Sequence, residues 1–433
     1  MNTINQNHPS GGLAPLRYWQ VRIFMVTWVA YAAFYLTRQA LSGAKLGILA
    51  DPIASQILSR EMLGTMDAIY LTVYAVGQFV WGGSADRWGV RVVVLTGLLV
   101  SAATALVMGL IPALILFLPL IAIQAAAQST GWAALCKNVN AFYPLRTRGR
   151  MMGLWSTCFI FGGLIGTPFA GWLAYGLFDS WRMAFVGSSL VLFVIAGVFY
   201  LAQRNTLSDV GLTAEVIEDG SEEEAKDRPP LRDTLLAPLR NAMVFKLGLS
   251  YLLLKPARYA ILFWGPVIAF EAIPSLSFLG ATVLPLAFGL AGLIAPVVLG
   301  WVSDKVFDGK RIPVAVLSLA FTILILVLFM PLASTGSIAF FVLALALLGF
   351  FLYGAEAIIS AVAAIDFGTQ RHAGAAVGFI NGCGAVGAIL GGWLPGWLPG
   401  FMSEGTLFIV FAVAAGLSML ILLPSWHRRA AQA

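Results

Sequence analysis

Long apolar stretches separated by short polar segments dominate the pattern of this chain. Runs of about twenty apolar residues recur, and each is long enough for a helix to cross the roughly 30 Å hydrocarbon core of a bilayer. The chain is thus predicted to be an all-α polytopic membrane protein with twelve transmembrane helices. We expect them near residues 20–46, 62–84, 91–111, 113–140, 150–177, 182–203, 242–271, 275–302, 312–332, 336–366, 373–399 and 404–424.

One strongly polar stretch, residues 204–241, separates the sixth span from the seventh. It contains three consecutive glutamates, Glu222 to Glu224, and then two prolines, and it lacks the apolar residues needed to bury a core. We interpret it as a cytoplasmic linker between an N-terminal six-helix half, residues 1–203, and a C-terminal half, residues 242–433.

The composition agrees with a chain that has lipid as its outer solvent. Hydrophobic residues make up 60% and charged residues 11%, against about 25% charged in an average soluble domain. The net charge of +6 reflects lysine and arginine concentrated in the loops on one side, with no cluster that would suit nucleic acid. That side carries both termini, so we expect a multi-pass inner-membrane protein with both termini cytoplasmic. The polar residues 1–12 do not resemble a cleaved signal peptide.

Metal, cofactor and enzymatic chemistry find no support. The cysteines, which form no C-x-x-C pair and are interpreted as packing residues, are Cys136, Cys158 and Cys383. The histidines, none expected at mid-membrane, are His8, His372 and His427. No G-x-x-x-x-G-K-[ST] motif indicates an ATP-driven pump, and no nucleophile–base set indicates an enzyme.

The two halves repeat each other. Tyr31-x6-Arg38 in the first span recurs as Tyr251-x6-Arg258 in the seventh, and Asp86 recurs at nearly the same offset as Asp304. Duplicated halves that meet at a central site are the architecture of many secondary transporters.

Two arginines at repeat-related positions, Arg38 and Arg258, are expected to lie deep in the membrane. Arg38 lies roughly 24 Å along a helix from Arg22, and an arginine at such depth costs at least about 2.5–3.5 kcal/mol. Arg258 is similarly deep, with Lys255 one turn earlier. A pair of guanidinium groups suits a clamp for phosphate or a similar oxyanion. The alternative is that each arginine pairs with a membrane carboxylate; the available carboxylates are Asp67, Glu356 and Asp366.

Further polar residues extend this candidate site. Asp67, Tyr70, Tyr74 and Gln78 form one stripe on the second span, and Lys137 fits a cavity or an interface equally well. Glu356 is expected at mid-depth, whereas Asp366 is expected to cap a helix end. The candidate substrate-binding residues are therefore Tyr31, Tyr35, Arg38, Tyr74, Gln78, Lys137, Lys255, Arg258, Glu356 and Asn381.

The loop after the second span carries a charged motif, Gly82-Gly-Ser-Ala-Asp86-Arg-Trp-Gly-Val-Arg91. It resembles the signature G-x-L-x-D-R-x-G-x-R of the major facilitator superfamily. We predict a conformational latch between the halves, although a short loop with positive-inside arginines is the alternative. The candidate latch residues are Gly83, Asp86, Arg87, Gly89, Arg91, Asp304 and Lys305. Two small-residue faces, Gly162-x3-Gly166 and Gly378-x3-Gly382, are predicted to pack helices.

The segment Tyr31-Ala-Ala-Phe-Tyr-Leu-Thr-Arg38 closely resembles helix 1 of the organophosphate:phosphate antiporter family, which includes bacterial glycerol-3-phosphate and hexose-phosphate transporters and a related sensor. Further matches that span both halves are Gly131-Trp132, Arg258-Tyr259, Trp264, Pro266, Tyr353-Gly354 and Ala373 to Phe379. The resemblance implies that Arg38 and Arg258 bind the substrate phosphate, and that the carrier exchanges an organic phosphate for inorganic phosphate by alternating access.

This chain departs from the family pattern at two positions. Gln78 stands where several relatives have lysine, and Phe159 stands where some have histidine, while Glu356 adds a negative charge. A zwitterionic phosphoester or phosphonate could place its ammonium group at Glu356. Besides antiport by a monomeric carrier, two functions remain open: proton symport through Asp67, Glu356 or Asp366, and a membrane sensor of sugar phosphate.

Overall fold

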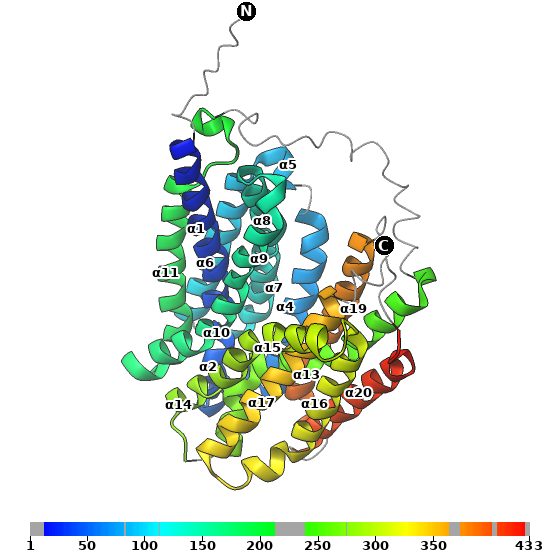
Figure 1. Cartoon of the computed structure of the whole chain (residues 1–433). Coiled ribbons are helices and arrows are strands. Elements are labelled where there is room, and N and C mark those ends of the chain that lie inside the picture. The colour runs from blue at the N-terminus through cyan, green and yellow to red at the C-terminus, as the bar shows by residue number, and fades with distance from the viewer. Residues whose placement is uncertain are drawn as a thin grey trace, which may run out of the picture.

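The computed structural model describes residues 13–81, 84–111, 113–212, 239–273, 275–362, 373–400 and 405–428. Regular secondary structure in these ranges is entirely helical (Figure 1). Ten of the described helical segments are long and apolar enough to cross a membrane. The α1–α2 pair and α4 occupy the two remaining predicted spans, and the predicted all-α polytopic fold is confirmed.

The N-terminal spans follow the predicted order with shifted ends. Their helices are α1 (Leu13–Arg38), α2 (Ala40–Ala50), α4 (Arg60–Trp81), α6 (Val90–Leu110), α7 (Phe117–Gln128), α8 (Gly131–Phe142), α9 (Leu145–Trp155), α10 (Thr157–Gly171) and α11 (Arg182–Ala202). Short helices α3 (Ala54–Ile57) and α5 (Ser84–Trp88) lie in the connections.

The C-terminal spans begin at Ala242, just after the described end of the polar stretch, residues 239–241. Their helices are α13 (Ala242–Ala272), α14 (Phe278–Val283), α15 (Leu286–Lys305), α16 (Arg311–Ala333), α17 (Ile338–Ala357), α19 (Ala373–Trp397) and α20 (Thr406–Leu422). A π-helical turn, Ile358–Val362, extends α17. Asp366 and His372 lie outside the described residues.

The first span differs from its prediction. It begins at Leu13, breaks at Gln39 and continues as α2 to Ala50, instead of running unbroken over residues 20–46. Gln39 has φ −87° and ψ −3°, which departs from the regular helical backbone. The irregular residue directly follows Arg38, the last residue of α1.

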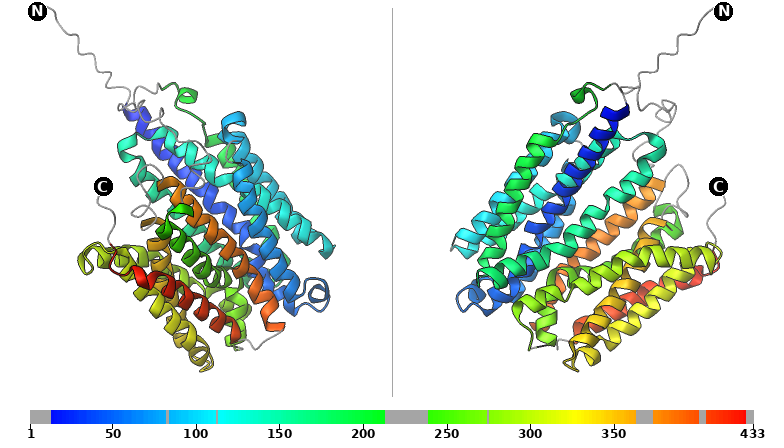
Figure 2. Two further views of the ribbon diagram at one scale, coloured as in Figure 1. Left: turned by 90° about the vertical axis from the view of Figure 1, so that its right-hand side faces the viewer. Right: turned by 60° about the vertical axis from the view of Figure 1, so that its left-hand side comes forward.

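The helix bundle has two ends, which we call the terminal end and the distal end. The terminal end is where α1 begins and α19 begins; the distal end is where α4 begins and α19 ends (Figures 1 and 2). Among the described residues, every hydrogen bond that joins an N-terminal span to a C-terminal span lies toward the distal end. The distal end is therefore closed.

Close packing of α4 on α19 contributes to this closure. A Cβ atom added at Gly64 would lie 2.9 Å from the Cα atom of Gly396 and 2.9 Å from the carbonyl oxygen of Trp393. Only glycine permits such an approach of two backbones. The predicted face at Gly162 and Gly166 does pack closely, against α1. A Cβ atom at Gly378 or Gly382 meets no described atom within 4 Å, so that predicted packing face was wrong.

We expect Gly64→Ala to separate the halves at the distal end, because the added methyl group meets backbone atoms that cannot rotate away. The measurement is labelling of Ser42→Cys by a membrane-impermeant maleimide in a background without native cysteines, since Ser42 is buried at this junction. Labelling should rise in Gly64→Ala. Gly382→Ala on α19 is the matched control, and equal labelling of the two variants would contradict the prediction.

Candidate substrate site

Arg38 ends α1 and is surrounded by aromatic rings. Its guanidinium carbon lies 4.2 Å from the ring centre of Tyr35 and 4.6 Å from that of Tyr74. Its Nε atom donates to Gln128 Oε1 at 3.1 Å, while its Nη2 atom is buried and has no hydrogen-bond partner among the residues that the structure describes. Among the described residues Arg38 has no carboxylate partner. A buried guanidinium with an unused N–H group is suited to an incoming oxyanion.

Gln128, at the end of α7, fixes the orientation of Arg38. Its Oε1 atom also accepts from the Tyr70 hydroxyl at 2.5 Å, and its Nε2 atom donates to Thr37 at 3.1 Å and to Ser101 at 2.8 Å. Because both ends of the amide are occupied, the oxygen is held toward Arg38. Gln128 was not among the residues predicted from the sequence, where it shows only as an uncharged amide in an otherwise apolar run.

Arg258, on α13, has a different partner. Its Nη1 atom donates to Glu356 Oε2 at 2.6 Å, and its guanidinium carbon lies 4.3 Å from the ring centre of Tyr353. The other oxygen of Glu356 lies 2.8 Å from Lys255 Nζ and accepts from the Tyr251 hydroxyl at 3.1 Å. The Nε atom of Arg258 is buried and has no hydrogen-bond partner within the described part of the chain. Structural pairing with a carboxylate therefore holds for Arg258 but, among the described residues, not for Arg38.

Both arginines line one cavity of about 70 Å³ between the N-terminal and C-terminal spans. That space exceeds the roughly 10–15 Å³ needed for a single water, so it accommodates several waters or a small anion. Tyrosines contributed by both sets of spans surround the arginines: Tyr35, Tyr70, Tyr74, Tyr259 and Tyr353. Phe159 also lines the cavity, so an apolar ring occupies the position where some relatives were expected to have histidine.

The other candidate residues lie outside the lining of this cavity. Tyr31 is buried behind it, with its hydroxyl 3.1 Å from that of Tyr74. Gln78 is half-buried farther along α4. Lys137 and Asn381 are exposed, and the amide of Asn381 donates to Val377 in its own helix.

Lys255 and Glu356 stand behind Arg258, also outside the cavity lining. Both oxygens of Glu356 are already engaged by cations, and only 5% of its side chain is exposed. This geometry does not favour Glu356 as a direct contact for a substrate ammonium group.

The candidate latch residues contact their own half wherever the structure describes them. Arg91 donates to the Tyr200 carbonyl oxygen through its side chain and to Asn205 through its backbone N–H. Arg87 lies over the neighbouring ring of Trp88, and Gly89 has a φ of 77° that favours glycine. In the second copy Asp304 pairs with Arg311, and Lys305 is exposed. Gly83 and the side chain of Asp86 are not among the described parts of the structure. The conformational latch between the halves therefore stays a prediction.

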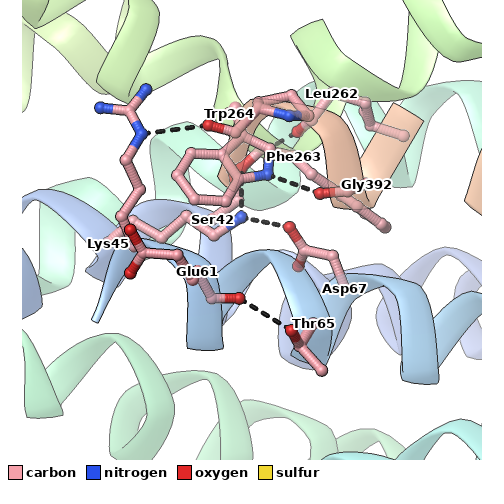
Figure 3. A network of polar contacts seen from close by, with 11 residues as sticks. Ser42, Lys45, Glu61, Thr65, Asp67, Leu262, Phe263, Trp264 and Gly392 are labelled. Atoms are coloured by element: carbon pink, nitrogen blue, oxygen red, sulfur yellow. Dashed lines mark hydrogen bonds and ion pairs between the residues drawn. The ribbon is translucent and has the colours of Figure 1, made fainter. Parts of the chain in front are cut away.

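Asp67 belongs to the distal junction and not to the cavity. Its carboxylate lies 2.5 Å from Lys45 Nζ, and Lys45 is completely buried (Figure 3). The same Nζ atom donates to the Phe263 carbonyl oxygen of α13 at 3.0 Å and lies 3.9 Å from the ring centre of Trp264. The expectation that Asp67 pairs with an arginine or lines the site was therefore wrong in this conformation. Lys45, which the sequence analysis missed, joins the two sets of spans.

Three further contacts lie at the distal junction, one within the C-terminal spans and two between the two sets of spans. Trp264 Nε1 donates to the Gly392 carbonyl oxygen at 3.0 Å (Figure 3). Arg60, at the start of α4, pairs with Glu271 of α13 and donates to the Pro395 carbonyl oxygen of α19 at 3.0 Å. An ammonium group and a guanidinium group of the N-terminal spans thus hold backbone and carboxylate oxygens of the C-terminal spans.

Comparison with solved structures shows the class of fold. A bacterial homolog of the human lysosomal transporter Spinster, in an inward-facing and unoccupied conformation, aligns with a TM-score of 0.71 and 15% identity over 94% of this chain and 95% of that chain. The two chains thus share one helical fold over nearly their whole length.

Sequence comparisons show the family. The sequence model of the Major Facilitator Superfamily matches residues 23–392 and 286–432. The membrane sensor protein UhpC of Salmonella typhimurium is 30% identical over 96% of this chain and 94% of its own length. A probable hexose phosphate transport protein of Chlamydia trachomatis is 25% identical over 95% and 92%. The glycerol-3-phosphate transporter of Bacillus subtilis is 25% identical over 86% and 85%. The chain belongs to the major facilitator superfamily and, within it, to the organophosphate:phosphate antiporter family.

Proposed function

We propose that this protein is a secondary transporter that exchanges a small organic phosphate or phosphonate for inorganic phosphate by alternating access. One observation carries the proposal: Arg38 and Arg258, from repeat-related helices, line the same cavity, and each retains a buried N–H group that no described residue engages. Guanidinium groups match the geometry of phosphate oxygens. The names of the relatives, which include hexose phosphate and glycerol-3-phosphate transporters, support the same substrate class.

Exchange also follows from the charge of the empty site. Closing both ends around Arg38 without an anion would leave its charge desolvated, which is costly in a low-dielectric interior. A bound phosphate of either kind removes that cost, so the loaded carrier reorients more readily than the empty one. The returning phosphate uses the same arginines, and no titrating residue is required.

The geometry around the carboxylates favours exchange over proton symport. Glu356 is held by Lys255 and Arg258, two cations that stabilise its charged form, whereas Asp67 is bound to Lys45 at the distal junction, away from the cavity. The lysine and arginine distribution supports an inner-membrane location with both termini and the latch loop in the cytoplasm. The terminal end is then cytoplasmic, and the closed distal end faces the opposite side.

The decisive experiment is counterflow in proteoliposomes. We expect internal phosphate to accelerate uptake of labelled phosphate and of glycerol-3-phosphate or hexose phosphates, and a pH gradient without internal phosphate to drive little accumulation. Accumulation driven by pH, unaffected by internal phosphate and eliminated by Glu356→Gln, would replace exchange with symport.

A sensor function is the second candidate, because two relatives at 30% and 29% identity are named membrane sensor proteins. A sensor would bind a sugar phosphate at the same arginines. Saturable ligand binding by the purified protein, combined with no counterflow for any ligand that binds, would favour the sensor over the transporter.

A further inference from the structure

The two arginines occupy equivalent positions in the repeat but differ in their charged surroundings. Aligning Arg38 with Arg258 places Tyr31 opposite Tyr251 and Tyr35 opposite Lys255. The C-terminal copy therefore carries one additional cation, Lys255, one turn before its arginine.

The partners of the two arginines differ in charge, and this difference offsets the additional charge of Lys255. Arg38 is held by the neutral amide of Gln128, whereas Arg258 is held by the carboxylate of Glu356. Glu356 contacts the additional cation as well, at 2.8 Å from Lys255 Nζ, and Tyr251 hydrogen-bonds to both Lys255 and Glu356. Counting formal charges, each copy of the repeat contributes one net positive charge, and the cavity carries two.

We propose that Lys255 and Glu356 form a matched charge pair that sets the net charge of the substrate site without touching the substrate. The inference rests on the proposed function and deepens it: two net positive charges correspond to the dianion of a phosphate monoester or of inorganic phosphate. Glu356 keeps the field at Arg258 weak enough for the anion to be released, while Lys255 offsets the charge of Glu356. Neither side chain lines the cavity, so both act through the electrostatic potential there and through the position of Arg258.

A merely structural role for the pair predicts different consequences. If Glu356 served only to orient Arg258, its replacement would weaken binding. Glutamine keeps one oxygen that accepts from Arg258, while its NH2 group replaces the oxygen that faces Lys255, so Glu356→Gln removes the charge but retains an acceptor that orients Arg258. Lys255→Met keeps the length and apolar stem of the side chain and removes the opposite charge.

The test measures equilibrium binding of inorganic phosphate, together with the KM and the maximal rate of phosphate exchange, for the wild type, both single variants and the double variant. We expect Glu356→Gln to lower the Kd on the order of tenfold and to slow exchange, because release becomes limiting. We expect Lys255→Met to raise the Kd by a similar factor. The double variant, which restores two net positive charges, should return to within about threefold of the wild type.

Opposite signs for the single variants with recovery in the double variant would establish the charge pair. Two outcomes would overturn the charge pair, provided that every variant elutes as a folded, monodisperse protein. One is a higher Kd for phosphate in Glu356→Gln, and the other is a double variant whose Kd lies as far from the wild type as that of the worse single variant. If the wild type neither binds nor exchanges phosphate, it is the proposed function that fails, and the two failures are thus distinguished.

Discussion

Replacing Arg38 or Arg258 with lysine is expected to abolish phosphate binding and exchange while the protein still folds. Lysine keeps the charge but loses the planar fork that grips two oxygens, and its shorter reach also gives up the contact of Arg38 with Gln128 or of Arg258 with Glu356. Losing one or two charge-assisted hydrogen bonds corresponds to roughly a hundredfold loss of affinity or more. Binding of labelled phosphate to purified protein measures this directly.

The matched control for the arginine variants is Arg17→Lys, an exposed arginine on the same helix as Arg38, which should bind phosphate like the wild type. Near-normal exchange by Arg38→Lys would remove that residue from the clamp. The same result for Arg258→Lys alone would leave a site built on the N-terminal spans.

The second large effect concerns stability at the distal junction. Lys45→Met should lower the free energy of unfolding by about 3–5 kcal/mol, because it leaves the buried carboxylate of Asp67 without its cation. Asp67→Leu should lower the free energy of unfolding similarly, because it leaves the buried ammonium group of Lys45 without its carboxylate. The double variant Lys45→Met/Asp67→Leu removes both charges and should recover much of the loss, since an apolar pair can replace a buried ion pair.

Thermal unfolding in detergent, followed by the monodisperse fraction on gel filtration, checks this prediction. Asp304→Asn serves as the comparison, because Asp304 pairs with Arg311 on the surface and such pairs contribute about 0–1 kcal/mol. Equal effects of Lys45→Met and Asp304→Asn would show that the buried pair contributes no more to stability than an exposed one.

The sequence predicted the two arginines because a guanidinium in the membrane is costly and needs a reason to be there. Gln128 carries no such signal, since an uncharged amide in an apolar helix is far less costly. Lys45 was missed for a geometric reason: the predicted span ended at residue 46, which placed Lys45 at an interface. The helix in fact continues past the break at Gln39 to Ala50, and Lys45 becomes fully buried.

The polar stripe on α4, from Asp67 to Gln78, was correctly predicted to share one helix face, but the whole stripe was assigned to the substrate site. Asp67 and Gln78 are eleven positions apart, and at 1.5 Å per residue they are separated by about 16 Å along the axis. One face of a single helix therefore meets the distal junction at Asp67, the cavity at Tyr70 and Tyr74, and a half-buried position at Gln78. Periodicity identifies the face, whereas only the packing of the other spans determines what each level of that face contacts.

The complete burial of Lys45 makes the two ends of the carrier respond differently to ionic strength. Dissolved ions screen exposed charges over about 8 Å at physiological salt but reach a dry ion pair poorly. Charged loops at the terminal end, such as the one with Asp304 and Arg311, are accessible to those ions, whereas Lys45 and Asp67 are not. Salt is therefore expected to weaken exposed charge pairs, such as Asp304–Arg311, more than the buried Lys45–Asp67 pair that helps to join the two halves at the distal end.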